Sequence, residues 1–292
     1  MKTSAAVLFL LFASGSVLAR AQTPTRLPAT GAFIDNNGAQ LYYQECGTGS
    51  QAVVLLHDGV VNSSVWDDVW ASFCKRFHAI RYDRRGYGRS PETKSPYYEA
   101  DDVAALLNSR KIAHAALVAS SHGGQVALEF ALRYSAYVSH LVVVGPSATG
   151  FPSSEYFLMR ERANSQSDKV EDLTEASVRD PFLIVPGHDA ARKRLRDLLT
   201  AAPQDLTHND MPLPEQPIFP HVQELRIPTL ILIGSGDIAD NHAIAGALVM
   251  AIPGAARIVV PDTGHLMYLE KPEEFFRQVS TFLTLHGFSP SS

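Results

Sequence analysis

The sequence lacks a basic stretch, an internal repeat and a low-complexity segment. Charged residues make up only 19% of its 292 residues, the formal net charge is −5, and the basic residues are scattered. We therefore expect no nucleic acid as a partner. The one local concentration, Arg192, Lys193, Arg194 and Arg196, has leucines at helical spacing and is predicted to be a solvated helix face. With 46% hydrophobic residues, the composition is that of a soluble globular protein.

Long apolar runs are also missing. No segment after the start of the chain approaches the roughly 20 apolar residues that a membrane-spanning helix needs. At the start, Lys2 precedes an apolar run from Ala5 to Ala13, and small residues follow up to Ala19 or Ala21. This layout predicts a cleaved secretory signal over residues 1–21. We expect export to the periplasm or the medium and no stable membrane insertion after cleavage; an uncleaved anchor is the alternative.

Cysteine is scarce, with Cys46 and Cys74 as the only two. In an exported protein they meet an oxidising compartment, where they could pair. The sequence carries no distance between them, so a disulfide and two free thiols both remain open.

The remainder of the chain alternates short apolar runs with amphipathic helical stretches, which predicts a mostly parallel sheet with helices on both faces. An Asn37-Gly38 turn between 32–36 and 40–45 predicts an antiparallel hairpin before the parallel part. Strand-like runs disappear over residues 150–217, which we interpret as an inserted helical cap. The predicted core therefore covers residues 22–149 and 218–292. Further strands are expected at 53–56, 78–82, 115–119, 141–144, 229–233 and 257–260, and helices at 64–76, 99–109, 123–134, 155–163, 190–199, 241–251 and 272–285.

The segment Ala119-Ser120-Ser121-His122-Gly123-Gly124 lies where a strand turns into a helix. Such a turn holds a serine in a strained conformation at the carboxyl edge of a sheet, between small residues. The usual pattern is G-x-S-x-G, and Ala119 replaces the first glycine. Ser121 is the predicted nucleophile. Ser120 is the competing one, but it would place His122 where a small residue is needed.

A serine hydroxyl needs a base, and the base needs an acid that orients it. His265 follows the last predicted strand, in Asp262-Thr263-Gly264-His265, and Asp237 ends Gly234-Ser235-Gly236-Asp237 after the preceding strand. We predict that His265 is the general base and Asp237 the acid; Asp240 and Asp262 are the fallback acids.

Catalysis by such a serine also needs backbone N–H donors for the developing oxyanion. We assign this role to the amides of His122 and of Gly59, which follows the first parallel strand. His57 is predicted to hold this loop through side-chain hydrogen bonds. Asp58 is unusual there, because a carboxylate would oppose the oxyanion unless it points away.

With these motifs, nearly the whole mature chain resembles the α/β-hydrolase superfamily, in particular bacterial esterases, enol-lactonases and cofactor-free haloperoxidases. The stretches Tyr82–Ser90 and Leu269–Phe275 resemble structural segments of that superfamily. The resemblance implies the α/β-hydrolase fold. Because haloalkane dehalogenases and epoxide hydrolases have a carboxylate where this chain has a serine, those two activities are disfavoured.

We therefore predict a hydrolase that cleaves a small-molecule carboxylic ester or lactone through an acyl-enzyme on Ser121, with no metal and no organic cofactor. Two alternatives stay open: a carbon–carbon bond hydrolase of ring-cleavage products, and a non-catalytic binding protein on the same fold. Apolar residues of the cap suggest an apolar substrate pocket: Phe151, Tyr156, Phe157, Met159, Phe182 and Leu183. The sequence does not indicate an oligomeric state.

Overall fold

The computed structural model describes residues 31–49, 51–164, 167, 169–207, 212–213 and 216–288. The predicted signal over residues 1–21 lies outside these ranges. No helix among the described residues combines the length and the apolar character needed to cross a bilayer.

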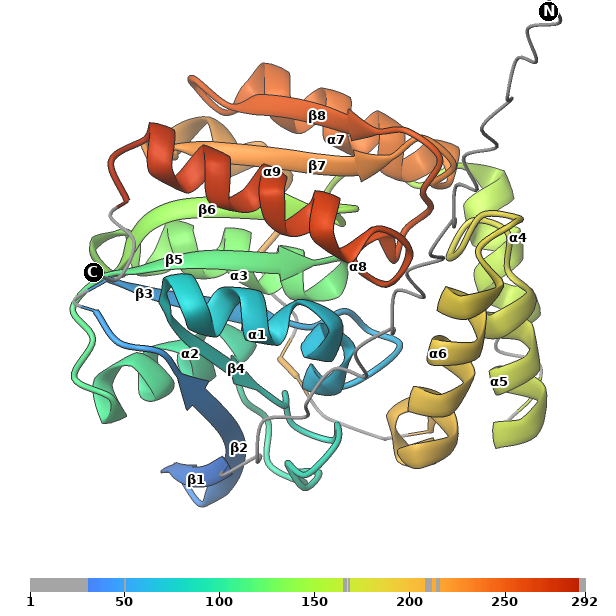
Figure 1. The fold of residues 1–292 in the computed structure, drawn as a ribbon, viewed down its shortest axis with the longest axis horizontal. Helices are drawn as coiled ribbons and strands as arrows, with labels where there is room; N and C mark the ends of the chain where they lie inside the picture. Colours follow the sequence, from blue (N-terminus) through green and yellow to red (C-terminus); the bar gives the residue numbers. More distant parts are fainter. Residues whose placement is uncertain are drawn as a thin grey trace, which may run out of the picture.

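One mixed sheet forms the centre of the molecule (Figure 1). Its strands follow one another in the order β1-β2-β4-β3-β5-β6-β7-β8. The β1–β2 and β2–β4 pairs are antiparallel, and all later pairs are parallel. The strands are β1 (Gly31–Asn36), β2 (Ala39–Cys46), β3 (Ala52–Leu56), β4 (His78–Tyr82), β5 (Ala115–Ser120), β6 (Val138–Val144), β7 (Thr229–Gly234) and β8 (Ala256–Val260).

The sequence predictions for this sheet are confirmed. Asn37 and Gly38 both have positive φ, at 54° and 83°, as a two-residue hairpin turn requires. Strands β3, β5 and β7 are buried along their whole length, because helices cover both faces of the sheet.

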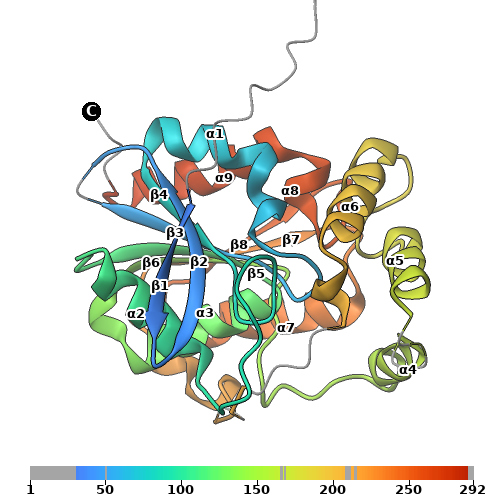
Figure 2. The same cartoon turned by 90° about the horizontal axis from the view of Figure 1, so that it is seen from below.

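Helices α1, α8 and α9 cover one face, and α2, α3 and α7 cover the other (Figures 1 and 2). Each layer encloses a hydrophobic cluster of its own. The predicted helix over 64–76 is a 3-10 turn (η1, Ser63–Trp66) followed by α1, and the one-turn helix α8 was not predicted. The helices are α1 (Asp67–Arg76), α2 (Glu99–Ser109), α3 (His122–Arg133), α7 (Ala239–Ala251), α8 (Met267–Glu270) and α9 (Pro272–Leu285).

The stretch 150–217 contains α4 (Glu155–Asn164), α5 (Val170–Arg179), α6 (Asp189–Ala201) and the 3-10 turn η3 (Pro203–Leu206). These helices stand beyond the carboxyl ends of the parallel strands (Figures 1 and 2). The prediction of a solvated basic face on α6 is wrong for two residues. Arg194 bonds Asp67 of α1 at 2.7 Å, and the Arg192 guanidinium donates to the carbonyls of Val178 and Ile184.

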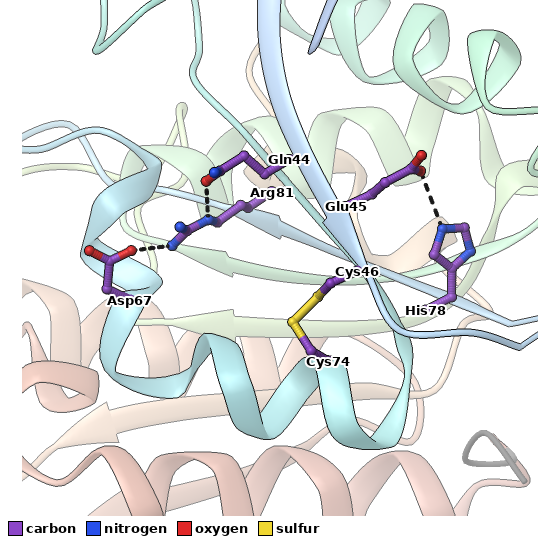
Figure 3. Close-up of a disulfide and its surroundings, with 7 residues drawn as sticks. All are labelled: Gln44, Glu45, Cys46, Asp67, Cys74, His78 and Arg81. Carbon is purple, nitrogen blue, oxygen red and sulfur yellow. Dashed lines mark hydrogen bonds and ion pairs between the residues drawn. A yellow bond between two sulfur atoms is a disulfide. The ribbon is translucent and has the colours of Figure 1, made fainter. Parts of the chain in front are cut away.

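The two cysteines form a disulfide that joins the end of β2 to α1 (Figure 3). The Cα atoms of Cys46 and Cys74 lie 5.1 Å apart, within the usual range for a bridge. Nearby, Arg81 of β4 bonds Gln44 of β2 at 2.9 Å and Asp67 of α1 at 2.8 Å, so the same two elements are also linked by polar contacts (Figure 3).

Candidate active site

Ser121 lies between β5 and α3 with φ 52° and ψ −118°. A positive φ is rare for a residue with a side chain, and such strain costs on the order of 1–3 kcal/mol. The Ser121 amide donates to the Val144 carbonyl of β6 at 2.8 Å, which helps to hold the turn. Ser121 lines a cavity, whereas Ser120 is fully buried and bonds Tyr268. The geometry thus separates the two candidate serines.

The small residues after Ser121 allow close packing of the turn. A Cβ on Gly123 would lie 2.3 Å from the His57 carbonyl oxygen, and a Cβ on Gly124 would lie 2.7 Å from a methyl group of Val143. Glycine is therefore required at both positions. Ala119, the departure from the usual motif, is fully buried within β5.

His265 and Asp237 form a buried pair. The Nδ1 atom of His265 lies 2.9 Å from Asp237 Oδ2, and the two side chains are 9% and 1% exposed. The other carboxylate oxygen accepts from the Ile238 amide at 2.7 Å and from Asn241 Nδ2 at 2.9 Å. Sequence reasoning missed Asn241, which lies one helical turn after Asp237 on α7.

The two fallback acids have other partners. Asp240 accepts hydrogen bonds from the amide and the hydroxyl of Ser154, both at 2.7 Å, and so fastens the start of the cap to α7. Asp262 is two-thirds exposed and pairs with Lys271 at 3.1 Å.

Gly145, at the end of β6, makes room for the His–Asp pair. It has φ 51°, and a Cβ there would lie 2.7 Å from His265 Nδ1 and 3.1 Å from Asp237 Oδ2. A glycine directly after a buried strand was the only signal for it in the sequence.

The loop that carries His265 is tied to the cap. Glu270 of α8 accepts from the amides of Gly264 at 2.6 Å and Val185 at 2.7 Å, and the His265 amide donates to the Phe182 carbonyl at 2.8 Å. Residues 182–185 of the cap stretch therefore help to hold the candidate base.

Electrostatics favour the protonated form of His265. Burial alone would lower its pKa, but the charge and hydrogen bond of Asp237 outweigh burial, and the charges of Asp58 and Asp180 add to this effect, so the pKa is raised.

His57 holds the loop after β3, as predicted. Its Nδ1 donates to the Asp58 carbonyl at 2.8 Å, and its Nε2 accepts from the Arg84 amide at 3.0 Å. Burial, and then the charge of Arg84, place the His57 pKa well below its usual value, which keeps the ring neutral. The Asp58 carbonyl and the Gly59 N–H belong to the same trans peptide group and point in opposite directions. The hydrogen bond from His57 to this carbonyl therefore directs the Gly59 N–H away from His57. Gly59 lines the cavity with Ser121.

His122 is the first residue of α3, where backbone N–H groups have no partner within the helix. Its ring bonds Glu99 at 2.6 Å, and Glu99 also pairs with the buried Arg84. Burial alone would raise the Glu99 pKa, but the charges of His122 and Arg84 lower it to about 2. The side chain of His122 thus fastens the start of α3 to the start of α2.

The cavity has a volume of about 370 Å³ and brings Ser121, Asp237, His265 and Gly59 together under the cap. Of the apolar residues predicted for the pocket, Phe157, Phe182 and Leu183 line it. The others do not: Phe151 packs on Phe219, and Tyr156 and Met159 are 46% and 58% exposed.

Fold and sequence comparison define this protein as an α/β-hydrolase enzyme. Residues 53–278 match the model of the alpha/beta hydrolase family, and the chain belongs to this family. It is 29% identical to a serine hydrolase of Mus musculus, BPHL, over 87% of this chain and 86% of the relative. It is 28% identical to a pimeloyl-[acyl-carrier protein] methyl ester esterase of Vibrio vulnificus, over 83% and 97%. It is also 29% identical to a 2-hydroxy-6-oxononadienedioate/2-hydroxy-6-oxononatrienedioate hydrolase of Burkholderia vietnamiensis, over 85% and 92%.

Proposed function

We propose that this enzyme hydrolyses an uncharged carboxylic ester or lactone through an acyl-enzyme on Ser121. The observation that carries the proposal is that the strained Ser121 shares one cavity with the buried His265–Asp237 pair and with Gly59.

In the proposed reaction, His265 Nε2 takes the proton of Ser121 Oγ as that oxygen attacks the substrate carbonyl. The amides of Gly59 and His122 stabilise the tetrahedral oxyanion. The intermediate collapses and expels the alcohol, which receives the proton from His265. Water then gives a proton to His265 and attacks the acyl-enzyme. As the second intermediate collapses, His265 returns this proton to Ser121 Oγ and the acid is released. Asp237 holds the ring so that Nε2 faces the serine, and it stabilises the imidazolium.

The charges of the cavity support an uncharged substrate. Arg160 is the only arginine or lysine among the described residues that line it, and its guanidinium is engaged by Asp180 and lies 4.9 Å from the Phe182 ring centre. Glu161 and Asp205 add carboxylates. A dioate, as named for the Burkholderia relative, would bring two negative charges to this cavity, which weighs against the carbon–carbon hydrolase alternative. The methyl ester named for the Vibrio relative fits the proposal better.

The nucleophile is tested by fluorophosphonate labelling followed by peptide sequencing. We expect an adduct on Ser121 that persists in Ser120→Ala and is lost in His265→Ala. Ser121→Ala should lose turnover of a p-nitrophenyl ester by a factor on the order of 10⁴ or more with its melting temperature retained. A folded wild-type protein that takes no label would instead support the binding-protein alternative.

The substrate charge is tested with two esters of similar length, p-nitrophenyl butyrate and p-nitrophenyl hemisuccinate. We expect kcat/KM to be at least about tenfold lower for the anionic hemisuccinate. Equal values, or a preference for the anion, would contradict an uncharged substrate.

We also propose that the protein is exported and loses residues 1–21. The support is the Lys2 and Ala5–Ala13 pattern together with the Cys46–Cys74 disulfide, since such bonds persist in oxidising compartments. Mass spectrometry of the mature protein tests this, and an intact Met1 would refute cleavage.

A further inference from the structure

Asp58 is a fully buried carboxylate beside the candidate oxyanion donor Gly59. Its Oδ1 accepts from the amides of Val60 at 2.6 Å and Val61 at 3.1 Å, and its Oδ2 accepts from the Tyr268 hydroxyl at 2.7 Å. These bonds offset the cost of burying the charge. The carboxylate therefore points into its own loop and toward α8, and Asp58 is not among the described residues that line the cavity.

Tyr268 joins this loop to the turn that carries Ser121. Its hydroxyl donates its one proton to Asp58, so its oxygen accepts from Ser120 Oγ at 3.0 Å. Burial raises the Tyr268 pKa far above its usual value, and the charge of Asp58 adds to this effect, so the hydroxyl stays protonated. The ring packs against Trp66 and Phe275, with centroid distances of 4.5 and 5.6 Å, which leaves little freedom for the hydroxyl.

The hydrogen bonds Ser120–Tyr268 and Tyr268–Asp58 connect residues that are close in sequence to the three parts of the candidate site. Ser120 precedes Ser121, Asp58 precedes Gly59, and Tyr268 lies three residues after His265. The amides of Val60 and Val61 donate to the Asp58 carboxylate. In this part of the loop, the Gly59 amide is therefore the one that we assign to a ligand. The backbone carbonyl of Asp58 is held by His57, so the residue before the donor is restrained at both its main chain and its side chain.

We propose that Asp58 and Tyr268 are positioning residues for the oxyanion donor: the Tyr268 hydroxyl holds the Asp58 carboxylate, and the carboxylate holds the loop that aims the Gly59 N–H at the reacting carbonyl. This inference rests on the proposed function, since it assigns residues that support the same reaction.

The positioning role is tested by Tyr268→Phe, which keeps the ring and removes only the hydroxyl. A displaced oxyanion donor weakens binding of the transition state more than binding of the substrate, so we expect kcat to fall about tenfold or more with KM within about twofold. The matched control is Tyr134→Phe. Its hydroxyl also bonds an aspartate, Asp101, at 2.7 Å, but at the far end of α3. The control should retain kcat within about twofold.

The role of the carboxylate is tested by Asp58→Ala, which removes the acceptor of the Val60 and Val61 amides. We expect kcat to fall about tenfold or more with KM within about twofold, as in Tyr268→Phe. A purely structural role would change the melting temperature of both variants and would not separate kcat from KM.

The controls distinguish failure of this inference from failure of the proposed function. If folded Tyr268→Phe and Tyr134→Phe have equal kcat while wild-type Ser121 is labelled by the fluorophosphonate, the positioning role is overturned alone. A wild-type protein that is not labelled overturns the proposed function and this inference with it. Should Tyr268→Phe not fold, kcat of Asp58→Ala decides, since a value equal to that of the wild type would overturn the positioning role.

Discussion

Asp237 and Asp240 lie three residues apart after β7, yet they bind different groups. Asp237 accepts from His265 and Asn241, whereas Asp240 accepts from Ser154 at the start of the cap. Both carboxylates are buried, so burial does not separate them. The two aspartates differ instead in the direction in which each side chain points.

Replacing each aspartate by asparagine tests this difference. Asp237→Asn should lower kcat by a factor on the order of 10³–10⁴, because an asparagine does not stabilise the imidazolium or favour the required tautomer. Asp240→Asn should change kcat by less than about tenfold and act mainly through KM, because it loosens the cap. Steady-state kinetics on a p-nitrophenyl ester measures both, and a reversed ranking would make Asp240 the acid.

The raised pKa of His265 predicts a pH dependence. The base must be neutral to accept the serine proton, so kcat/KM should fall as pH decreases through an apparent pKa above 6.5. The sign is opposite for stability. A raised pKa in the folded state stabilises the fold fully below about pH 6.5, and this contribution is lost as pH rises through the raised value. A pH–rate profile with an acidic limb clearly below 6.5 would contradict this.

At the scale of elements, helices α8 and α6 and the 3-10 turn η3 connect the cap to the core. The one-turn helix α8 carries both Tyr268 and Glu270, which hold the loops around Gly59 and His265. Helix α6 contacts α1 through Arg194. The turn η3 contacts the loops after β3 and β4 through Asp205, which accepts from Asn62 at 2.8 and 2.9 Å and from Gly88 at 2.8 Å. Burial raises the Asp205 pKa to about 6. The cap is thus tied to the core by buried and half-buried polar contacts.

Two adjacent residues of α6 test this attachment. Arg194→Ala breaks the bond to Asp67 and exposes the interface with α1, so we expect a loss of about 1–2 kcal/mol in the free energy of unfolding and faster proteolysis of the cap. Lys193→Ala removes an exposed contact with Asp197 on the same helix and should cost less than about 0.5 kcal/mol. Urea unfolding and limited proteolysis measure both effects; equal behaviour of the two variants would show that α6 is not held through Arg194.

At the scale of the whole molecule, the sheet separates two hydrophobic clusters, and the disulfide fastens the antiparallel edge to one helical layer. The bridge spans 28 residues of sequence and restricts the unfolded chain. Neither cysteine lines the cavity.

The double variant Cys46→Ala/Cys74→Ala should therefore lose about 3–4 kcal/mol in the free energy of unfolding, as expected for a closed loop of this size. Because the cavity is untouched, kcat of the folded variant should stay within about twofold of the wild type. Urea unfolding with and without a reductant gives the comparison. A wild-type protein whose midpoint does not change on reduction would contradict a stabilising role for the bridge.

The sequence by itself determined the α/β architecture and the candidate serine, histidine and acid. Apolar runs such as 53–56 and 115–119 bury on both faces and so predict parallel strands. Because the carboxyl ends of parallel strands meet at one edge, Ser121, Asp237 and His265 were expected to converge there. These inferences depend on local pattern and chain order, which a sequence contains.

Only the tertiary structure decided what depends on distance and direction between segments far apart in the chain. It paired Cys46 with Cys74, turned Asp58 toward Tyr268, docked Arg194 on α1 and placed Gly145 against His265. It also shows that Tyr156 and Met159 are exposed, although their apolar character predicted that they would line the pocket. Local propensity cannot settle such questions, because one residue type is equally compatible with several directions until packing selects the partner.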